Sequence, residues 1–245
     1  MNLPSTDPAL PNFSRVAAVI ADPTRARMLA ALLCGEYRSA GELATVAGIT
    51  PQAASTQLAQ LVDASLVAVR QQGRHKYFAL ADAEVAYALE ALSLVAARDG
   101  VSTRWERPAY QPLKCARRCY GHMAGELGVA QFGMLMRCGY LHEPAPNPPA
   151  QSGPGSPPGL KLSNAGSMWV ARLGLTLPNK TASRFAYPCM DWSERKDHLA
   201  GILARALLEH YLAKNWLGSE PGARALNLTP QGQRELMPLL NEMPP

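Results

Sequence analysis

The sequence has no apolar run long enough to cross a membrane, and its first residues lack the basic-then-apolar pattern of a secretory signal. It also lacks glycine-rich dinucleotide or phosphate loops, a Gly-x-Ser-x-Gly elbow and a His-Glu-x-x-His helix. We therefore expect a cytoplasmic protein with no membrane partner that is not an enzyme. The alternative class is an enzyme or organic-ligand-binding domain with a regulatory DNA-binding module. Polar residues that could serve acid–base chemistry are Asp191, Glu194, Asp197 and His198, but residues 191–195 equally fit the capped start of the following helix.

Cysteine is scarce, and the five cysteines are odd in number and unevenly spaced. A disulfide framework normally uses an even number of cysteines in an oxidising compartment. In the cytosol we expect reduced thiols that serve as core, redox or metal-binding residues.

One face of a predicted helix has no acidic side chains. This helix belongs to the segment from which we interpret the rest of the chain. Ser39 and Glu42 have the spacing of a capping box, which starts a helix, and Gly48 ends that helix. Thr50 can cap a second helix, and Pro51 suits its first turn. Two helices joined by a tight glycine-containing turn form a helix-turn-helix.

The open face of this second helix carries only small, hydroxyl and amide side chains before Asp63. Such side chains can bond to base edges in the major groove, and they do not repel the phosphate backbone. The residues of this segment that we expect to contact DNA are Thr50, Gln52, Ala53, Ser55, Thr56, Gln57 and Gln60.

A β-hairpin is predicted directly after the helix-turn-helix. Residues 66–70 and 76–80 are β-prone, and a glycine-bearing linker joins them. Basic residues near its tip, predicted to reach phosphates or the minor groove, are Arg70, Arg74, His75 and Lys76. A helix-turn-helix followed by a basic hairpin is a winged helix. The alternative is a three-helix domain whose solvated hairpin has no role in nucleic-acid binding.

Net positive charge is absent from residues 1–100, where eight Lys and Arg residues stand against nine Asp and Glu residues. DNA affinity would then depend on a few phosphate contacts and on dimerisation. Apolar residues follow helical spacing over 13–20 and 85–95, either to close the domain core or to pack against a second copy. The predicted dimer residues are Phe13, Val16, Ile20, Leu89 and Leu92.

Three segments occur in a characteristic order: Ala-Asp-Pro-Thr-Arg at 21–25, Ile-Thr-Pro-Gln-Ala-Ala-Ser-Thr-Gln-Leu at 49–58, and Gly-Arg-His-Lys-Tyr at 73–77. On these segments, residues 12–98 resemble the ArsR/SmtB family of bacterial winged-helix repressors. The resemblance implies a homodimer built on the first and fifth helices, a double-stranded DNA operator, and repression until an inducer weakens DNA binding. The family's familiar metal sites do not carry over, because residues 41–47 contain no cysteine and residues 82–97 contain no histidine.

The predicted fold class is mainly α with small β-wings. A winged helix for DNA binding and dimerisation at 12–98 precedes an α-rich domain for sensing or assembly at 112–245, which holds a mobile Pro/Gly-rich loop at 143–159. Helices are predicted at 112–127, 129–140 and 198–216.

A weak internal repeat joins Leu-Lys-Leu-Ser-Asn-Ala-Gly at 160–166 to Leu-Asn-Leu-Thr-Pro-Gln-Gly at 226–232. Each copy has apolar–polar alternation, a hydroxyl helix cap and a glycine in the first turn. The second domain is therefore either a degenerate second winged helix or an all-helical extension with a coincidental repeat.

Cys115, Cys119 and His122 have i, i+4 and i+7 spacing, which places them on one face of the helix predicted over 112–127. Two thiols and an imidazole are ligands for zinc or a soft metal or metalloid ion, and Cys189 would make four. The alternative for this face is ordinary core packing with a hydrogen-bonded histidine.

Basic residues next to these thiols would favour the thiolate, which also suits an oxidant or an electrophile; they are Lys114, Arg117 and Arg118. If the thiols are structural, an organic inducer would bind near aromatic residues of the second domain, namely Trp169, Tyr187 and Trp192.

Overall fold

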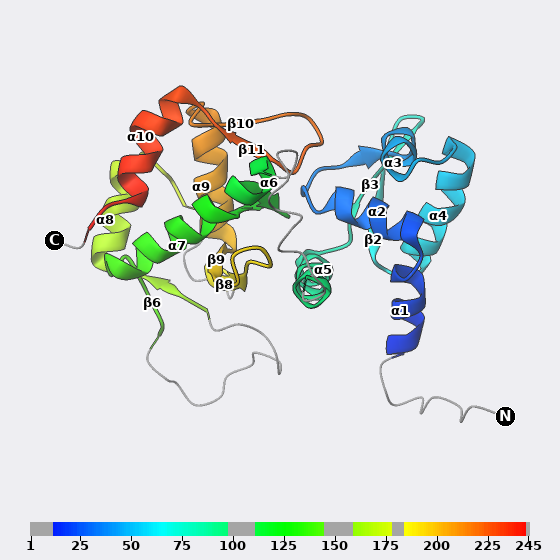
Figure 1. Ribbon diagram of the computed structural model, residues 1–245, viewed down its shortest axis with the longest axis horizontal. Helices are drawn as coiled ribbons and strands as arrows, with labels where there is room; N and C mark the ends of the chain where they lie inside the picture. The colour runs from blue at the N-terminus through cyan, green and yellow to red at the C-terminus, as the bar shows by residue number, and fades with distance from the viewer. Residues whose placement is uncertain (1–11, 98–110, 145–158, 178–183, 244–245) are drawn as a thin grey trace. The chain divides into compact units, whose positions relative to one another are not determined.

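The computed structural model describes residues 12–97, 111–144, 159–177 and 184–243, and the chain divides into two compact units, residues 1–85 and 86–245 (Figure 1). The tail predicted at 1–11 and nearly all of the loop predicted at 143–159 lie outside the described residues. In the described part of the chain, no helix is both long enough and apolar enough to cross a membrane.

Local capping interactions start each of the first four helices. These helices are α1 (Phe13–Ile20), α2 (Pro23–Leu32), α3 (Ala40–Ala47) and α4 (Pro51–Asp63). The predicted capping box is confirmed, because the Ser39 side chain accepts from Glu42 N while the Glu42 carboxylate accepts from Ser39 N at 2.8 Å. Gly48 ends α3 in the left-handed region at φ +68°, and Thr50 caps α4. The helix-turn-helix therefore forms as predicted.

A three-stranded antiparallel sheet completes the winged helix. Its strands are β1 (Arg38–Ser39), β2 (Val67–Gln72) and β3 (His75–Leu80), in the order β1–β3–β2. The β2–β3 hairpin is longer than predicted, because its turn needs only residues 73 and 74, with Gly73 at φ +59°. The buried core of this unit includes Met28, Leu29, Leu43, Leu58, Leu61 and Phe78.

Helix α5 (Ala83–Ala96) starts with Asp82, whose carboxylate accepts a hydrogen bond from Val85 N at 2.8 Å. The two compact units divide inside this helix, between Val85 and Ala86. From the sequence we instead predicted that the whole helix belongs to a domain that ends at residue 98. That assignment remains a prediction.

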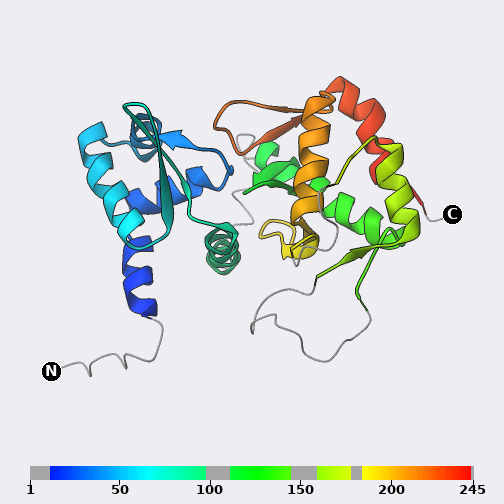
Figure 2. The same ribbon diagram turned by 180° about the vertical axis from the view of Figure 1, so that it is seen from behind.

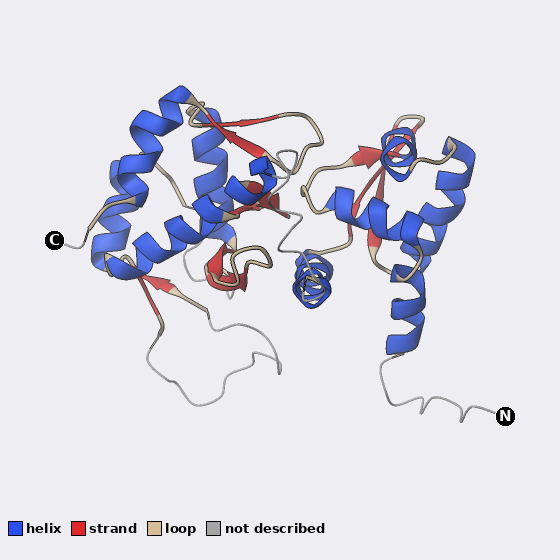
Figure 3. Cartoon of the chain, viewed as in Figure 1, coloured by secondary structure: helices blue, strands red, loops and turns tan. Residues whose placement is uncertain are grey.

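After α5, the second unit has a short helix and then the same order of elements twice: strand pair, helix, strand pair, helix. After α6 (Gln111–Cys115), the first copy contains β4 (Arg117–Cys119), β5 (His122–Ala124), α7 (Glu126–Arg137), β6 (Leu141–His142), β7 (Lys161–Leu162) and α8 (Asn164–Arg172). The second copy contains β8 (Tyr187–Met190), β9 (Asp197–Ala200), α9 (Ile202–Ala213), β10 (Leu217–Ser219), β11 (Leu226–Leu228) and α10 (Pro230–Leu240). Figure 3 shows the short strands as red segments between the helices.

The repeat predicted at 160–166 and 226–232 is real in three dimensions. Ser163 Oγ accepts from Gly166 N at 2.9 Å, and Thr229 Oγ1 accepts from Gly232 N at 2.9 Å. A Cβ on Gly166 would lie 2.1 Å from a backbone carbonyl oxygen, and one on Gly232 would lie 1.9 Å from another. Both glycines are therefore required by a close approach of backbone to helix. Figure 2 shows the two capped helices, α8 and α10, side by side, as does Figure 1.

The first strand pair of each copy is also repeated, and this feature was not predicted from the sequence. His122 and His198 each stand three residues before a glycine that precedes a helix. These glycines, Gly125 and Gly201, have φ of +82° and +98°. Their backbone conformation is one that other residues rarely adopt, so each chain turns sharply from hairpin into helix.

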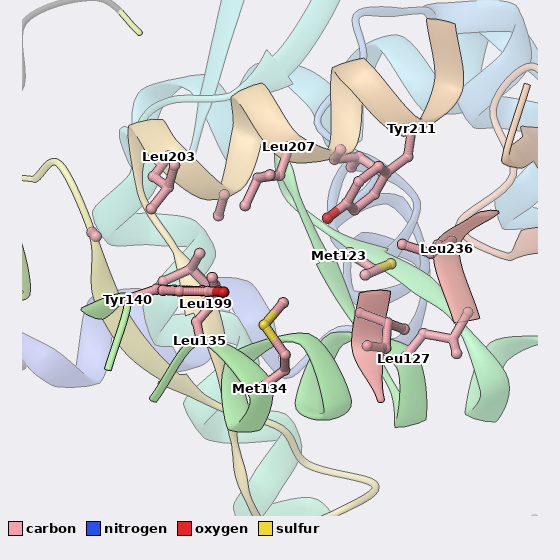
Figure 4. Close-up of a cluster of buried hydrophobic side chains, with 14 of the residues drawn as sticks. Met123, Leu127, Met134, Leu135, Tyr140, Leu199, Leu203, Leu207, Tyr211 and Leu236 are labelled. Carbon is pink, nitrogen blue, oxygen red and sulfur yellow. The ribbon is translucent and has the colours of Figure 1, made fainter. Parts of the chain in front are cut away.

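Helices α7 and α9 enclose the apolar core of the second unit, and Figure 4 shows their side chains facing one another. Leu127, Met134 and Leu135 come from α7, while Leu203, Leu207 and Tyr211 come from α9. Met123 of β5, Leu199 of β9 and Leu236 of α10 fill the space around them.

Several predicted helices in this unit are wrong or displaced. The helix over 112–127 is broken into α6, β4 and β5, because the chain reverses at Tyr120, which has φ +61°. The helix over 198–216 starts only at Ile202, because Gly201 cannot occupy a helix interior at φ +98°. Residues 191–195 form no capped helix start, but lie in the loop between β8 and β9. The helix predicted at 129–140 is α7, shifted by about one turn.

The all-helical alternative for this unit is also wrong, because its described residues contain four antiparallel strand pairs. Each copy does have the strand pair and capped helix of a winged helix. Among the described residues, however, the unit has no pair of consecutive helices joined by a short turn.

Candidate DNA-binding surface and a buried cysteine–histidine cluster

Helix α4 presents an exposed face without acidic side chains over its first two turns. Gln52, Ala53, Ser55 and Thr56 are all exposed on it. Thr50 Oγ1 accepts from Ala53 N at 3.3 Å, so this hydroxyl is used for capping. The Ser55 hydroxyl donates to Pro51 O at 3.1 Å. Contact of these exposed side chains with base edges stays a prediction.

Arg25 holds Gln57 and Gln60 in place. From the sequence, Arg25 is named only as part of a segment that carries the family resemblance. Arg25 Nη1 donates to Gln57 Oε1 at 2.7 Å and to Gln60 Oε1 at 2.5 Å. Arg25 Nε also donates to Val19 O at 2.7 Å. The guanidinium of Arg25 thus joins α1, α2 and α4, and it orients two of the predicted DNA-reading amides.

The wing adds positive charge beside α4. Arg74, His75 and Lys76 are exposed at the hairpin tip. A hollow in the first unit is lined by these three residues together with Ser55 of α4. Arg70 instead lies over the ring of Tyr37, with its guanidinium carbon 5.9 Å from the ring centroid. The acid-free face and the basic tip therefore form one continuous surface.

The predicted dimer residues are only partly available to a partner. Phe13 is 75% exposed and Leu92 is 43% exposed, whereas Leu89 is only 8% exposed within its own chain. Val95 of α5 is 53% exposed and was not in the predicted set. The apolar surface of α5 that a second copy could cover is therefore shifted toward its C-terminal half.

Four buried side chains form a compact cluster in the second unit: Cys119, His122, Cys189 and His198. Their nearest potential ligand atoms all lie within 4.8 Å of one another. Their exposures are 2%, 8%, 4% and 0%, respectively. Within β4–β5, Cys119 is the cross-strand partner of His122, and within β8–β9, Cys189 is the cross-strand partner of His198.

The imidazoles of this cluster lack hydrogen-bond partners at several atoms. Both ring nitrogens of His198 and Nδ1 of His122 are buried without one. Burial, followed by the neighbouring His198 and Arg205, lowers the pKa of His122 well below its usual value, so the ring is neutral at physiological pH. A neutral imidazole is the form that binds metal ions.

An ion pair lies buried next to the cluster. Arg117 Nη2 and Asp191 Oδ1 are 2.8 Å apart, and the two side chains are 1% and 0% exposed. Gly125 N donates to Asp191 Oδ2 at 2.7 Å. Burial alone would raise the pKa of Asp191, but Arg117 and the Gly125 N–H outweigh it and hold that pKa below its usual range. Asp191 is therefore charged at neutral pH.

From the sequence we predicted that Cys115 binds the same ion as Cys119 and His122, and the inclusion of Cys115 is wrong. Because the predicted helix is broken after Cys115, that thiol does not belong to the cluster, and His198 takes its place. The expected thiolate is also wrong, since a hydrogen bond with Cys189 and burial raise the pKa of Cys119 well above its usual value. Lys114 pairs with Glu126, and Arg117 pairs with Asp191.

The three aromatic residues proposed for an organic inducer have different neighbours. Trp169 stacks on Tyr140 with ring centroids 5.6 Å apart. The Arg117 guanidinium carbon lies 4.7 Å from the ring centroid of Trp192, and that of Arg184 lies 5.4 Å from the ring centroid of Tyr187. A shared pocket for an organic inducer stays a prediction.

A helix-turn-helix with a basic β-wing defines the winged-helix class of DNA-binding proteins. Comparison with known proteins agrees with this class: a family model described as a helix-turn-helix domain matches residues 20–70. The uncharacterized HTH-type transcriptional regulator YdfF of Bacillus subtilis is 34% identical over 225 residues, which cover 91% of this chain and 94% of the relative. The chain belongs to the HTH-type transcriptional regulators, and it is a DNA-binding regulator with the winged helix that the ArsR/SmtB resemblance implied.

Other similar proteins match a smaller part of the chain. The HTH-type transcriptional regulator CmtR of Mycobacterium bovis is 40% identical over 88 residues, which cover 36% of this chain and 74% of the relative. The solved structure of the cadmium metal-sensor CMTR from Mycobacterium tuberculosis is 38% identical with a TM-score of 0.29, and the match covers 34% of this chain and 82% of that one.

Proposed function

We propose that this regulator is a cytosolic homodimeric repressor that binds double-stranded operator DNA and releases it when the second unit binds an inducer. The observation that carries the DNA-binding part is the surface formed by the acid-free face of α4 and the basic wing tip. A groove-reading helix and a charged hairpin contribute base contacts and phosphate contacts, respectively.

The dimer is supported by apolar surface on two helices. Phe13 of α1, together with Leu92 and Val95 of α5, exposes large apolar side chains that a single chain leaves in solvent. Large apolar side chains exposed in this way are typical of interfaces. A dimer would also double the few phosphate contacts that one wing can make.

The response to an inducer requires a connection from the cysteine–histidine cluster to α5, of which residues 86–96 belong to the second unit. Glu90 of α5 is 2% exposed, and its carboxylate accepts from Arg224 at 2.5 Å. Arg224 in turn donates from Nε to the backbone oxygen of Arg118, the residue before Cys119, at 3.2 Å. Rearrangement near the cysteine–histidine cluster would therefore be felt by a helix of the proposed dimer interface.

The test of DNA reading compares affinity for a fragment from upstream of the protein's own gene with affinity for unrelated DNA. We expect Gln52→Ala and Ser55→Ala each to cost about 1–3 kcal/mol of discrimination for a lost base contact. The control is Gln233→Ala, which removes an exposed amide from α10. Unchanged discrimination in both α4 variants would contradict the assignment of α4 as the reading helix.

The wing should behave differently in the same titrations. We expect Arg74→Ala to weaken specific and nonspecific binding alike and to reduce the slope of log affinity against log salt by about 1, as for one lost phosphate contact. Arg234→Ala, which removes an exposed charge from α10, is the control. A salt slope equal to that of the parent would contradict a phosphate contact at the wing.

The dimer is tested by light scattering at micromolar concentration. Val95→Glu should produce a monomer that binds the operator more weakly, because a charge cannot be buried in an apolar interface without a partner. Met168→Glu changes a residue that is 69% exposed on α8 and should leave the dimer intact. A parent protein that is monomeric yet fully active in operator binding would contradict the dimer.

A further inference from the structure

We propose that Cys119, His122, Cys189 and His198 bind one tetrahedral divalent ion of the zinc type. The donor set is two thiols and two imidazoles, which is a combination that structural zinc sites use. None of these residues belongs to the proposed DNA-binding surface, so the metal site does not depend on the DNA-binding assignment.

The spacing of the four side chains suits such an ion. Zinc binds thiolate sulfur at about 2.3 Å and imidazole nitrogen at about 2.0–2.1 Å, so ligand atoms around one ion lie about 3–4 Å apart. The four ligand atoms here already lie within 4.8 Å of one another. The ligand atoms are therefore close to the spacing that a bound ion requires.

Ordinary core packing explains this cluster poorly. An imidazole that is buried for structural reasons normally finds hydrogen-bond partners for its nitrogens. His198 is 0% exposed and has none at either nitrogen. A bound cation supplies the missing partner for one nitrogen of each imidazole.

The surroundings of His198 also match a metal ligand. Asp191 Oδ2 lies 3.6 Å from His198 Nδ1. Metal-bound histidines commonly direct the nitrogen that does not bind the ion toward a carboxylate, which sets the tautomer. Arg117 and Gly125 N fix the position of this carboxylate, so Nε2 of His198 is the nitrogen left to face the ion.

Charge balance favours a divalent ion at this depth. When the ion binds, each thiol of Cys119 and Cys189 releases one proton to solvent, and both imidazoles bind as neutral rings. Two thiolates and a divalent cation sum to zero, so the buried site carries no net charge. Two buried thiolates without the ion would be strongly disfavoured.

The architecture indicates a structural role. Each copy of the internal repeat contributes one cross-strand Cys–His pair, from β4–β5 and from β8–β9. One ion would therefore join the two copies at their first strand pairs. Four buried protein ligands leave no position for water or substrate, which is typical of closed structural sites.

The first experiment uses the full-length protein purified without chelator and without added metal. We expect about one zinc per chain by elemental analysis, in line with a single four-ligand site. Cobalt-substituted protein should show the ligand-field and thiolate-to-cobalt absorption of a tetrahedral S2N2 site. A folded parent protein that contains no metal and yields no such cobalt spectrum would overturn the proposal, as would a Cys119–Cys189 disulfide in its place.

The second experiment locates the ligands. Cys119→Ser and His198→Asn should lose stoichiometric zinc and the cobalt spectrum, whereas Cys115→Ser, four residues from Cys119 but outside the cluster, should keep both. Retention of zinc by both cluster variants, or loss of it in Cys115→Ser, would overturn the assignment. If the cluster variants do not fold, mercurial titration of the parent decides, because modification of Cys119 and Cys189 must release the zinc.

Discussion

The helix-turn-helix of the first unit and the cysteine–histidine cluster of the second unit place their polar side chains in opposite environments. The first unit keeps most of its predicted DNA-contacting side chains in solvent, and it anchors its helices by caps such as Ser39 and Thr50. The second unit buries His198, Asp191 and Arg117 completely or nearly so. An exposed site tolerates the loss of one side chain, whereas a buried polar network has to be complete, because an unpaired buried charge is costly.

The largest effect should come from breaking the buried pair. We expect Asp191→Asn to destabilise the second unit by about 3–5 kcal/mol, because Arg117 would keep its charge without a partner. All four tryptophans lie beyond residue 100, so their fluorescence in a urea titration reports on this unit.

The matched control for this prediction is an exposed ion pair of the same unit. Arg172 and Glu242 are 3.7 Å apart, and the Arg172 side chain is 68% exposed. Arg172→Ala should cost less than about 1 kcal/mol. Equal urea midpoints for Asp191→Asn and Arg172→Ala would show that burial does not separate the two kinds of pair.

Glycine-to-alanine substitutions should also destabilise the second unit more than the first. Gly232→Ala is expected to cost about 3 kcal/mol, since its methyl group would collide with a backbone carbonyl that cannot rotate away. Gly48→Ala meets no atom within 4 Å and should cost only about 1–2 kcal/mol for its left-handed backbone. Thermal unfolding followed by circular dichroism measures both. A larger loss of stability for Gly48→Ala would mean that left-handed backbone strain costs more than the collision at Gly232.

Arg25 offers a test of how far the first unit depends on long-range polar contacts. Arg25→Lys keeps the charge but loses the fork that joins α1 to Gln57 and Gln60. We expect a loss of about 2 kcal/mol in stability and weaker discrimination between operator and unrelated DNA. Arg27→Lys on the exposed side of α2 is the control and should change neither measurement.

The smallest effect should be at the capping box. Ser39→Ala is expected to cost about 1 kcal/mol. Hydrogen bonds from the Ser39 side chain, followed by its backbone N–H, lower the pKa of Glu42. Because the folded pKa lies below the unfolded one, the contribution of Glu42 is present at neutral pH and is lost as pH falls through the folded pKa. A Glu42→Gln variant should therefore differ from the parent in urea midpoint at pH 7 but not at acidic pH below that pKa.

Much of the first unit was determined by the sequence itself. The caps at Ser39, Thr50 and Asp22 act within three residues of the backbone groups they satisfy. Hydrophobic spacing and the turn at Gly73 are equally local. Such interactions leave a direct pattern in the chain, so the helices, the wing and the exposed residues of α4 could be predicted. The cap repeat at Ser163 and Thr229 was predicted for the same reason.

Tertiary structure alone decided the cluster. The spacing of Cys119 and His122 fits a helix face as well as a hairpin, and only the pairing of β4 with β5 resolves which one forms. His198 lies in β9, and the pairing of β9 with β8 places it opposite Cys189. Arg117 and Asp191 are 74 residues apart, yet they form one buried ion pair. Contacts between such distant positions depend on how whole elements pack, and no local backbone preference records them.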